Sequence, residues 1–205
     1  MDEKEFAAEL AEAALMLQVE DNLDQFAAYC QQHQERISQA FCHSFQTLFQ
    51  KGLELQAQGR LGPVAYLAIA VLRTLLMEGC YQLRLDLYDA SYFLSKIECS
   101  AYLDLEYLFK YIDTDINGLI ADLKECGGKY PTYEIDNLKK EYISVYATIA
   151  QAFLVQNLPA ILGLAEYKLL KKTADFKILY GEYLDRTAVI YDAAASSGAG
   201  PGSEA

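Results

Sequence analysis

One segment of this chain, residues 79–91, constrains its fold more than any other. Side chains alternate strictly there, with Tyr81, Leu83, Leu85 and Leu87 on one side and Gln82, Arg84, Asp86 and Tyr88 on the other. A period of two residues predicts a β-strand with one buried face, because successive side chains of a strand point to opposite faces of a sheet. A lone strand cannot satisfy its backbone hydrogen bonds, so the chain must supply partner strands.

The partner strands are predicted far away in the sequence, in residues 176–191. Aromatic and β-branched residues there predict a hairpin with strands at 176–183 and 187–191 and a turn at 185–186. The aromatic residues also recur at helical spacing, so a helix is the alternative, although Gly181 would weaken it. We expect the hairpin, and with it a small antiparallel sheet of about three strands that includes residues 81–88.

Most of the remaining chain shows the apolar spacing of long amphipathic helices. These helices are predicted at about residues 3–17, 21–58, 63–79, 95–126, 132–157 and 160–172. The expected fold is therefore mainly α (α+β), a multi-helix bundle closed by the small sheet, in a single domain over residues 1–192. Residues 193–205 contain no bulky apolar side chain, so we expect a flexible tail of Ala, Ser and Gly there.

The charge composition limits the partners. The chain has 29 acidic and 17 basic residues, a net charge of -12 at pH 7. Nucleic acids and anionic membrane surfaces are bound by clustered Lys and Arg, so neither is expected as a partner, and a basic protein is the favoured charged partner. The most apolar segment, 64–77, contains Arg73 and is shorter than the roughly 20 residues of a membrane span.

The cysteines and the N-terminal sequence predict where the protein works. Five widely spaced cysteines are an odd number, and they lie in apolar segments that are typical of a reduced core. The chain opens with acidic residues, whereas a signal peptide has a basic start followed by an apolar run. These features predict a protein of the cytoplasm.

A short acidic motif predicts a cation site. Asp113, Asp115, Asn117 and Gly118 match the first half of a calcium-binding EF-hand loop, in which alternating oxygen ligands surround a hard cation. The twelfth loop position, which should supply a bidentate Glu, is Lys124. The same residues also lie within the apolar stripe of a predicted helix, so a solvated helix face is the alternative.

Arginine and tyrosine supply the second candidate site. Arg73 lies among apolar residues and requires either an acidic partner or a polar cavity, and Arg84 lies on the polar side of the predicted strand. The chain has 16 tyrosines, whose rings and hydroxyl groups suit a half-wet pocket or a protein interface. We predict a ligand pocket lined by Arg73, Arg84, Tyr66 and Tyr88.

No catalytic motif stands out, so no catalytic residue and no cofactor are predicted. The favoured function is a non-enzymatic protein-binding module, such as an adaptor, a chaperone-like protein or a regulatory protein. The alternatives are a small-ligand-binding or sensor domain built on the Arg and Tyr pocket, and a calcium-binding module. Long helices with apolar residues on two sides also favour a homodimer.

Overall fold

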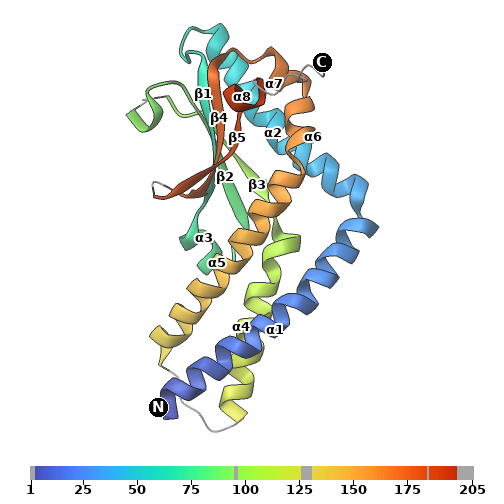
Figure 1. Ribbon diagram of the computed structural model, residues 1–205, viewed down its shortest axis with the longest axis vertical. Helices are drawn as coiled ribbons and strands as arrows, with labels where there is room; N and C mark the ends of the chain where they lie inside the picture. The colour runs from blue at the N-terminus through green and yellow to red at the C-terminus, as the bar shows by residue number, and fades with distance from the viewer. Residues whose placement is uncertain (1–2, 95–96, 126–130, 184, 198–205) are drawn as a thin grey trace, which may run out of the picture. The chain divides into compact units, whose positions relative to one another are not determined.

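The computed structural model describes residues 3–94, 97–125, 131–183 and 185–197 (Figure 1). In these ranges the protein is α+β, with eight α-helices, one short 3-10 helix and five strands. The chain divides into two compact units, which are described separately below. The helical unit contains residues 1–37, 73–81 and 105–150, and the sheet unit contains residues 38–72, 82–104 and 151–205.

The helical unit is built from long helices. Its elements are α1 (Glu3–Gln32), α3 (Arg73–Met77), α4 (Glu106–Glu125) and α5 (Thr132–Gln156) as far as Ala150. Leu15 and Val19 of α1 are buried, as are Phe109 and Ile112 of α4 and Ile143 of α5. The first predicted helix boundary was wrong, because α1 continues through residues 20–24, three of which are acidic, and ends at Gln32.

The sheet unit places one helix against a mixed sheet. The helix is α2 (Gln34–Ala57) from Ser38 onward, and the strands are β1 (Val64–Val71), β2 (Gln82–Tyr88), β3 (Ser100–Asp104), β4 (Lys172–Glu182) and β5 (Thr187–Asp192). The strand order is β3-β2-β1-β4-β5, with β1 and β4 parallel and the other pairs antiparallel. The predicted strand at 81–88 and the predicted hairpin at 176–191 are thus confirmed.

The prediction of about three antiparallel strands in a helical bundle was wrong in two respects. The sheet in the described chain has five strands, and it is mixed. The missing strands, β1 and β3, lie in segments that were predicted as helices. All of β1 is buried except Tyr66, so its sequence is a continuous apolar run without alternation, and such a run does not distinguish a strand from a buried helix.

Short elements complete the sheet unit. They are η1 (Tyr92–Leu94), α6 (Leu158–Gly163), α7 (Ala165–Leu169) and α8 (Ala193–Ser197). The predicted helix at 160–172 is therefore two short helices followed by β4. The first five residues of the predicted tail form α8, and residues 198–205 lie outside the described ranges.

The two faces of the sheet differ in chemistry. Helix α2 lies against one face, where Gly52 approaches so closely that an added Cβ would be 2.8 Å from Leu87 Cδ1 (Figure 1). Leu83, Leu85 and Leu87 of β2 are fully buried on this side. Because side chains alternate along a strand, Arg84 and the other polar residues of β2 belong to the opposite face.

No helix in the described part of the chain is long and apolar enough to cross a lipid bilayer.

Candidate functional site

The candidate site is the sheet face opposite α2. The register of β1 with β2 pairs Tyr66 with Tyr88, Ala68 with Asp86 and Ala70 with Arg84, so these six side chains share that face. The neighbouring strands extend it, because Arg84 is also paired with Tyr102 of β3, and Ala70 with Gly181 of β4. Ala68, Ala70 and Gly181 thus form a strip of small residues on this face, with larger residues around it, among them Leu179, which is paired with Ala68. We call this surface the tyrosine face and define it by Arg84, Asp86, Tyr66, Tyr88, Tyr92, Tyr102 and Tyr183.

A buried ion pair lies on the tyrosine face. Arg84 Nε is 2.8 Å from Asp86 Oδ2, and Arg84 Nη2 is 3.0 Å from Asp86 Oδ1, so the contact is bidentate. Arg84 Nη2 also lies 3.1 Å from Glu98 Oε1. The side chain of Arg84 is 19% exposed and that of Asp86 only 4% exposed, whereas Glu98 is 70% exposed.

Burial and pairing shift the pKa of both members of this pair. The hydrogen bond to Asp86 raises the pKa of the Arg84 guanidinium, which therefore stays charged. Burial raises the pKa of the Asp86 carboxyl, and the hydrogen bond from Arg84 opposes this shift only in part. A carboxylate so far from solvent depends on the guanidinium for its charge compensation.

Three tyrosine rings pack against one another at one end of the face. The Tyr92 ring from η1 makes edge contacts with Tyr66 at 4.9 Å and with Tyr88 at 5.1 Å between ring centroids. The backbone of Tyr92 has φ 51°, a left-handed conformation that is uncommon for a bulky residue. Burial raises the pKa of Tyr88 and of Tyr92, so both hydroxyl groups remain protonated at neutral pH.

Two further tyrosines, both exposed, lie beside Arg84. The Arg84 guanidinium carbon lies over the Tyr183 ring, 5.2 Å from its centroid, which is a cation-π contact. Tyr183 is 38% exposed, and Tyr102 on the other side of Arg84 is 47% exposed. The face therefore presents aromatic area, hydroxyl groups and one guanidinium that is already bound to carboxylates.

Of the predicted pocket residues, the structure brings Arg84, Tyr66 and Tyr88 onto one face. Arg73 belongs to the helical unit, so its place in the same site stays a prediction. Sequence reasoning missed Asp86 as the partner of Arg84. Residues two positions apart in a strand lie on the same face, so the spacing of the two residues could have indicated the pair. Sequence reasoning also missed Tyr102 as a member of this face, because that residue fell in a segment that was predicted as a helix.

The predicted calcium ligands lie within α4, in continuous helix. Asp113 forms an ion pair with Lys139 and accepts a hydrogen bond from the Tyr81 hydroxyl. Residues two positions apart in a helix point to nearly opposite sides, so Asp113 and Asp115 do not converge as they would in an EF-hand loop. Within the residues that the structure describes, no three His, Cys, Asp or Glu side chains meet as metal ligands, and calcium binding stays a prediction.

Asp115 belongs to a second polar cluster in the helical unit. Its carboxylate accepts hydrogen bonds from Asn22 Nδ2 at 2.6 Å and from the Tyr142 hydroxyl. Asn22 is only 5% exposed and also donates to the Tyr146 hydroxyl at 3.0 Å. These contacts join α1, α4 and α5, so the cluster explains why a polar residue is buried in the middle of α1.

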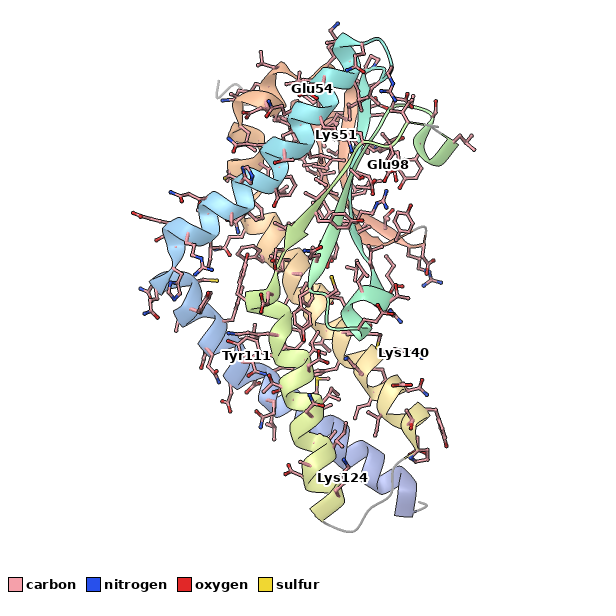
Figure 2. The ribbon with its side chains drawn as sticks, turned by 180° about the vertical axis from the view of Figure 1, so that it is seen from behind. Lys51, Glu54, Glu98, Tyr111, Lys124 and Lys140 are labelled. Atoms are coloured by element: carbon pink, nitrogen blue, oxygen red, sulfur yellow. The ribbon has the colours of Figure 1, made fainter. Side chains whose placement is uncertain are left out.

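The remaining tyrosines of the helical unit pack between helices. Figure 2 shows Tyr111 pointing from α4 toward α1, and Tyr111 is 8% exposed. Lys110 Nζ lies 5.1 Å from the ring centroid of Tyr29 on α1, and the Tyr107 ring stacks near Phe26. Tyrosines thus pack between helices in one unit and form the tyrosine face in the other, where Tyr167 and Tyr180 are also buried in the core.

Comparison with known proteins gives no relative, since no protein-family model, no curated protein and no solved structure matches the chain.

Proposed function

We propose that this chain is a non-enzymatic protein-binding module of the cytoplasm, acting as an adaptor, a chaperone-like protein or a regulatory protein, and that the tyrosine face is its contact surface. The observation that supports this proposal is the collection of five tyrosines and one arginine on a single face. These residues come from β1, β2, η1, β3 and the first residue after β4, which are far apart in the sequence. Tyrosine and arginine are the side chains that most often dominate the binding energy of protein interfaces.

The charges of the face favour a neutral or basic partner. Two positive charges, Arg84 and Lys177, meet three negative charges on this face, because Arg84 contacts Asp86 and Glu98 and Lys177 contacts Asp192. Glu98 is largely exposed. An incoming carboxylate or phosphate would have to compete with Asp86 for the guanidinium fork. A lysine or arginine of the partner would instead find an exposed carboxylate beside aromatic rings, and this arrangement supports both ion pairing and cation-π contact.

A small-ligand-binding or sensor domain is the second candidate. Its support is that Arg84, Tyr66 and Tyr88 lie on one face, beside the small side chains of Ala68 and Ala70. The occupied guanidinium makes an anionic ligand the less favourable choice. A neutral or cationic ligand with hydrogen-bonding groups fits the tyrosine hydroxyls better.

Paired variants test the protein-binding proposal. In the double variant Tyr102→Ser with Tyr183→Ser, both exposed rings of the face are lost, whereas Tyr133→Ser removes a tyrosine that is 64% exposed on α5. Proteins from the native host are captured on each immobilised variant and identified, and the affinity of the purified partner is then measured by calorimetry. We expect a partner that the wild type and Tyr133→Ser bind equally and that the double variant binds at least roughly tenfold more weakly.

Two results would contradict the proposal. One is a partner that binds the double variant as tightly as it binds the wild type, with circular dichroism showing that both are folded. The other is a small molecule that raises the melting temperature of the wild type but not of the double variant, together with no protein captured on the immobilised wild type. That result would favour the ligand-binding alternative.

A further inference from the structure

The backbone of Tyr92 is the strongest unexplained feature of the sheet unit. Among the described residues, Tyr92 is the one residue other than glycine with a positive φ, 51°. A bulky residue rarely adopts this left-handed conformation, so the contacts of its side chain must hold it there. Strained residues of this kind are concentrated at binding surfaces and switch segments.

The Tyr92 side chain touches three strands of the sheet. Its ring packs edge-on against Tyr66 of β1 and Tyr88 of β2. Burial raises the pKa of Tyr92, and a side-chain hydrogen bond with Thr187 of β5 opposes that shift. A hydrogen bond that lowers the pKa of a phenol is one donated to the phenol oxygen, so the Thr187 hydroxyl donates to Tyr92.

Tyr92 and the start of β5 meet above the strip of small residues. In the sheet, β4 lies between β1 and β5, so a side chain that contacts both β1 and β5 crosses β4. The first residues of β5 also fold over β4 at Gly181, where an added Cβ would be 2.2 Å from the Arg186 carbonyl oxygen and 2.8 Å from the Thr187 Cα. The hydrogen bond between Thr187 and Tyr92 therefore closes a cover over this part of the tyrosine face.

The segment that carries Tyr92 is bonded within itself. The N–H of Tyr92 binds the Asp89 carbonyl, and the N–H of Leu94 binds the Ser91 carbonyl. The N–H of Ser91 binds the Asp89 carboxylate. Of the η1 side chains that the structure describes, Tyr92 is half-buried, whereas Leu94 is 86% exposed. These backbone bonds move with the segment, so it can leave the face without breaking a strand hydrogen bond.

We propose that Tyr92 is an autoinhibitory gate of the tyrosine face. In the closed state its ring lies on Tyr66 and Tyr88 and its oxygen accepts the hydrogen bond from Thr187. In the open state residues 89–94 move away from the sheet and expose both rings and the strip of small residues. The opening is a property of this chain alone, whereas its effect on a partner rests on the protein-binding function proposed above.

Opposing contributions set the balance between the two states. The closed state gains the ring contacts and the Thr187 hydrogen bond, and the open state relieves the strained backbone of Tyr92. Losing one neutral hydrogen bond shifts an equilibrium by roughly two- to tenfold. Thr187→Val removes this bond and keeps the shape of the side chain, so it should raise the open population by that factor. A partner that binds the open state should then bind more tightly by the same factor, because the competent state is more populated.

Slow nitration of tyrosine by tetranitromethane measures the opening without any partner. A slow reagent accumulates its product at rings that are exposed only in a minor state. Thr187→Val should increase the nitration rates of Tyr66 and Tyr88, measured by peptide mapping, at least about twofold over the wild type. The matched control is Thr148→Val, which removes an exposed threonine hydroxyl on α5, and Tyr133, which is 64% exposed, is the internal reference.

A second variant reaches the same hydrogen bond from its other side. Tyr92→Phe keeps the ring and removes the phenol oxygen, so it should open the face as Thr187→Val does. The double variant should open it no further than either single variant, because both substitutions remove one and the same bond. Calorimetry with the purified partner should show each variant binding more tightly than the wild type, by the factor that nitration gives.

The two measurements separate failure of the gate from failure of the protein-binding function. Equal nitration of Tyr66 and Tyr88 in the wild type, Thr187→Val and Thr148→Val would overturn the gate, whether or not a partner is found. Faster nitration in Thr187→Val with unchanged affinity for the partner would overturn its autoinhibitory role. Faster nitration with no protein captured on the wild type would support the opening and contradict the protein-binding function instead. Circular dichroism confirms that each variant is folded.

Discussion

The buried ion pair on the tyrosine face gives the sharpest stability prediction. Arg84→Met keeps most of the unbranched stem of the side chain but leaves the Asp86 carboxylate without its bidentate partner. Because Asp86 is 4% exposed and Arg84 19% exposed, solvent cannot replace the lost contact. Breaking a buried pair in this way costs roughly 3–5 kcal/mol of unfolding free energy.

The pH dependence of this cost follows from the pKa of Asp86. Burial raises that pKa in the folded protein, so the stability contribution of the carboxyl is fully present below its unfolded pKa and is lost as pH rises through the folded pKa. Arg84→Met removes the interaction that opposes the upward shift, so Asp86 becomes protonated at a higher pH in the variant. The destabilisation by Arg84→Met should therefore be largest near roughly pH 7 and smaller near roughly pH 5.

Urea unfolding followed by circular dichroism measures these differences, since the chain has no tryptophan for a fluorescence assay. Arg60→Met is the control, because Arg60 is exposed, and it should change the unfolding free energy by less than about 0.5 kcal/mol. The double variant Arg84→Met with Asp86→Leu should recover most of the loss, because it no longer buries an unpaired charge. An Arg84→Met variant as stable as the control, or a cost that is the same at both pH values, would refute the reasoning.

Three further predictions follow from other parts of the structure. Gly181→Ala should lower the unfolding free energy by roughly 1–3 kcal/mol, because the new Cβ would lie 2.2 Å from the backbone oxygen of Arg186 in the hairpin. Gly118→Ala in α4, where nothing lies within 4 Å of the new Cβ, should raise the unfolding free energy by about 1 kcal/mol. Urea titrations in which both variants change the unfolding free energy in the same direction would contradict this geometry. Asp115→Ala should lower the unfolding free energy by roughly 1–3 kcal/mol in buffer with EDTA, because it leaves the buried donors of Asn22 and Tyr142 without their acceptor. A loss of unfolding free energy that appears only when calcium is present would support a calcium site instead. Burial raises the pKa of the Cys99 thiol to about 11, so Cys99 in the folded protein should be alkylated much more slowly than the half-buried Cys42. Peptide mapping by mass spectrometry measures the two alkylation rates, and equal rates would mean that this part of the core opens readily.

The sequence by itself determined β2, a strand whose apolar side chains are buried on one face while its polar side chains lie on the other. The alternation in residues 81–88 predicted β2, because a strand with one face toward a helix and one toward polar groups must repeat every two residues. The aromatic and β-branched residues of 176–191 predicted the hairpin through their preference for strands. The same alternation placed Arg84, Asp86 and Tyr88 on one face, so three members of the candidate site were predictable from a local pattern.

Tertiary structure decided the secondary structure of the segments whose sequences show no clear periodic pattern of a strand. β1 lies in the centre of the sheet with neighbours on both sides, and burial of both faces removes the alternation by which a strand is recognised. β3 was hidden because its few residues also fit a helical stripe, and with it Tyr102 was assigned to the wrong element. The aspartates of α4 show the converse, since a motif with loop spacing became continuous helix with hydrogen-bonded side chains.

The candidate site as a whole also required the tertiary structure. The pairing of β1 with β2 brings Tyr66 next to Tyr88, and the pairing of β1 with β4, across about a hundred residues of chain, brings Tyr183 next to Arg84. Local periodicity reports which side of an element is buried, but it carries no information about which distant element lies against it. The sequence therefore determined the one-sided elements and the acidic charge, and the long-range pairing of strands decided which side chains meet.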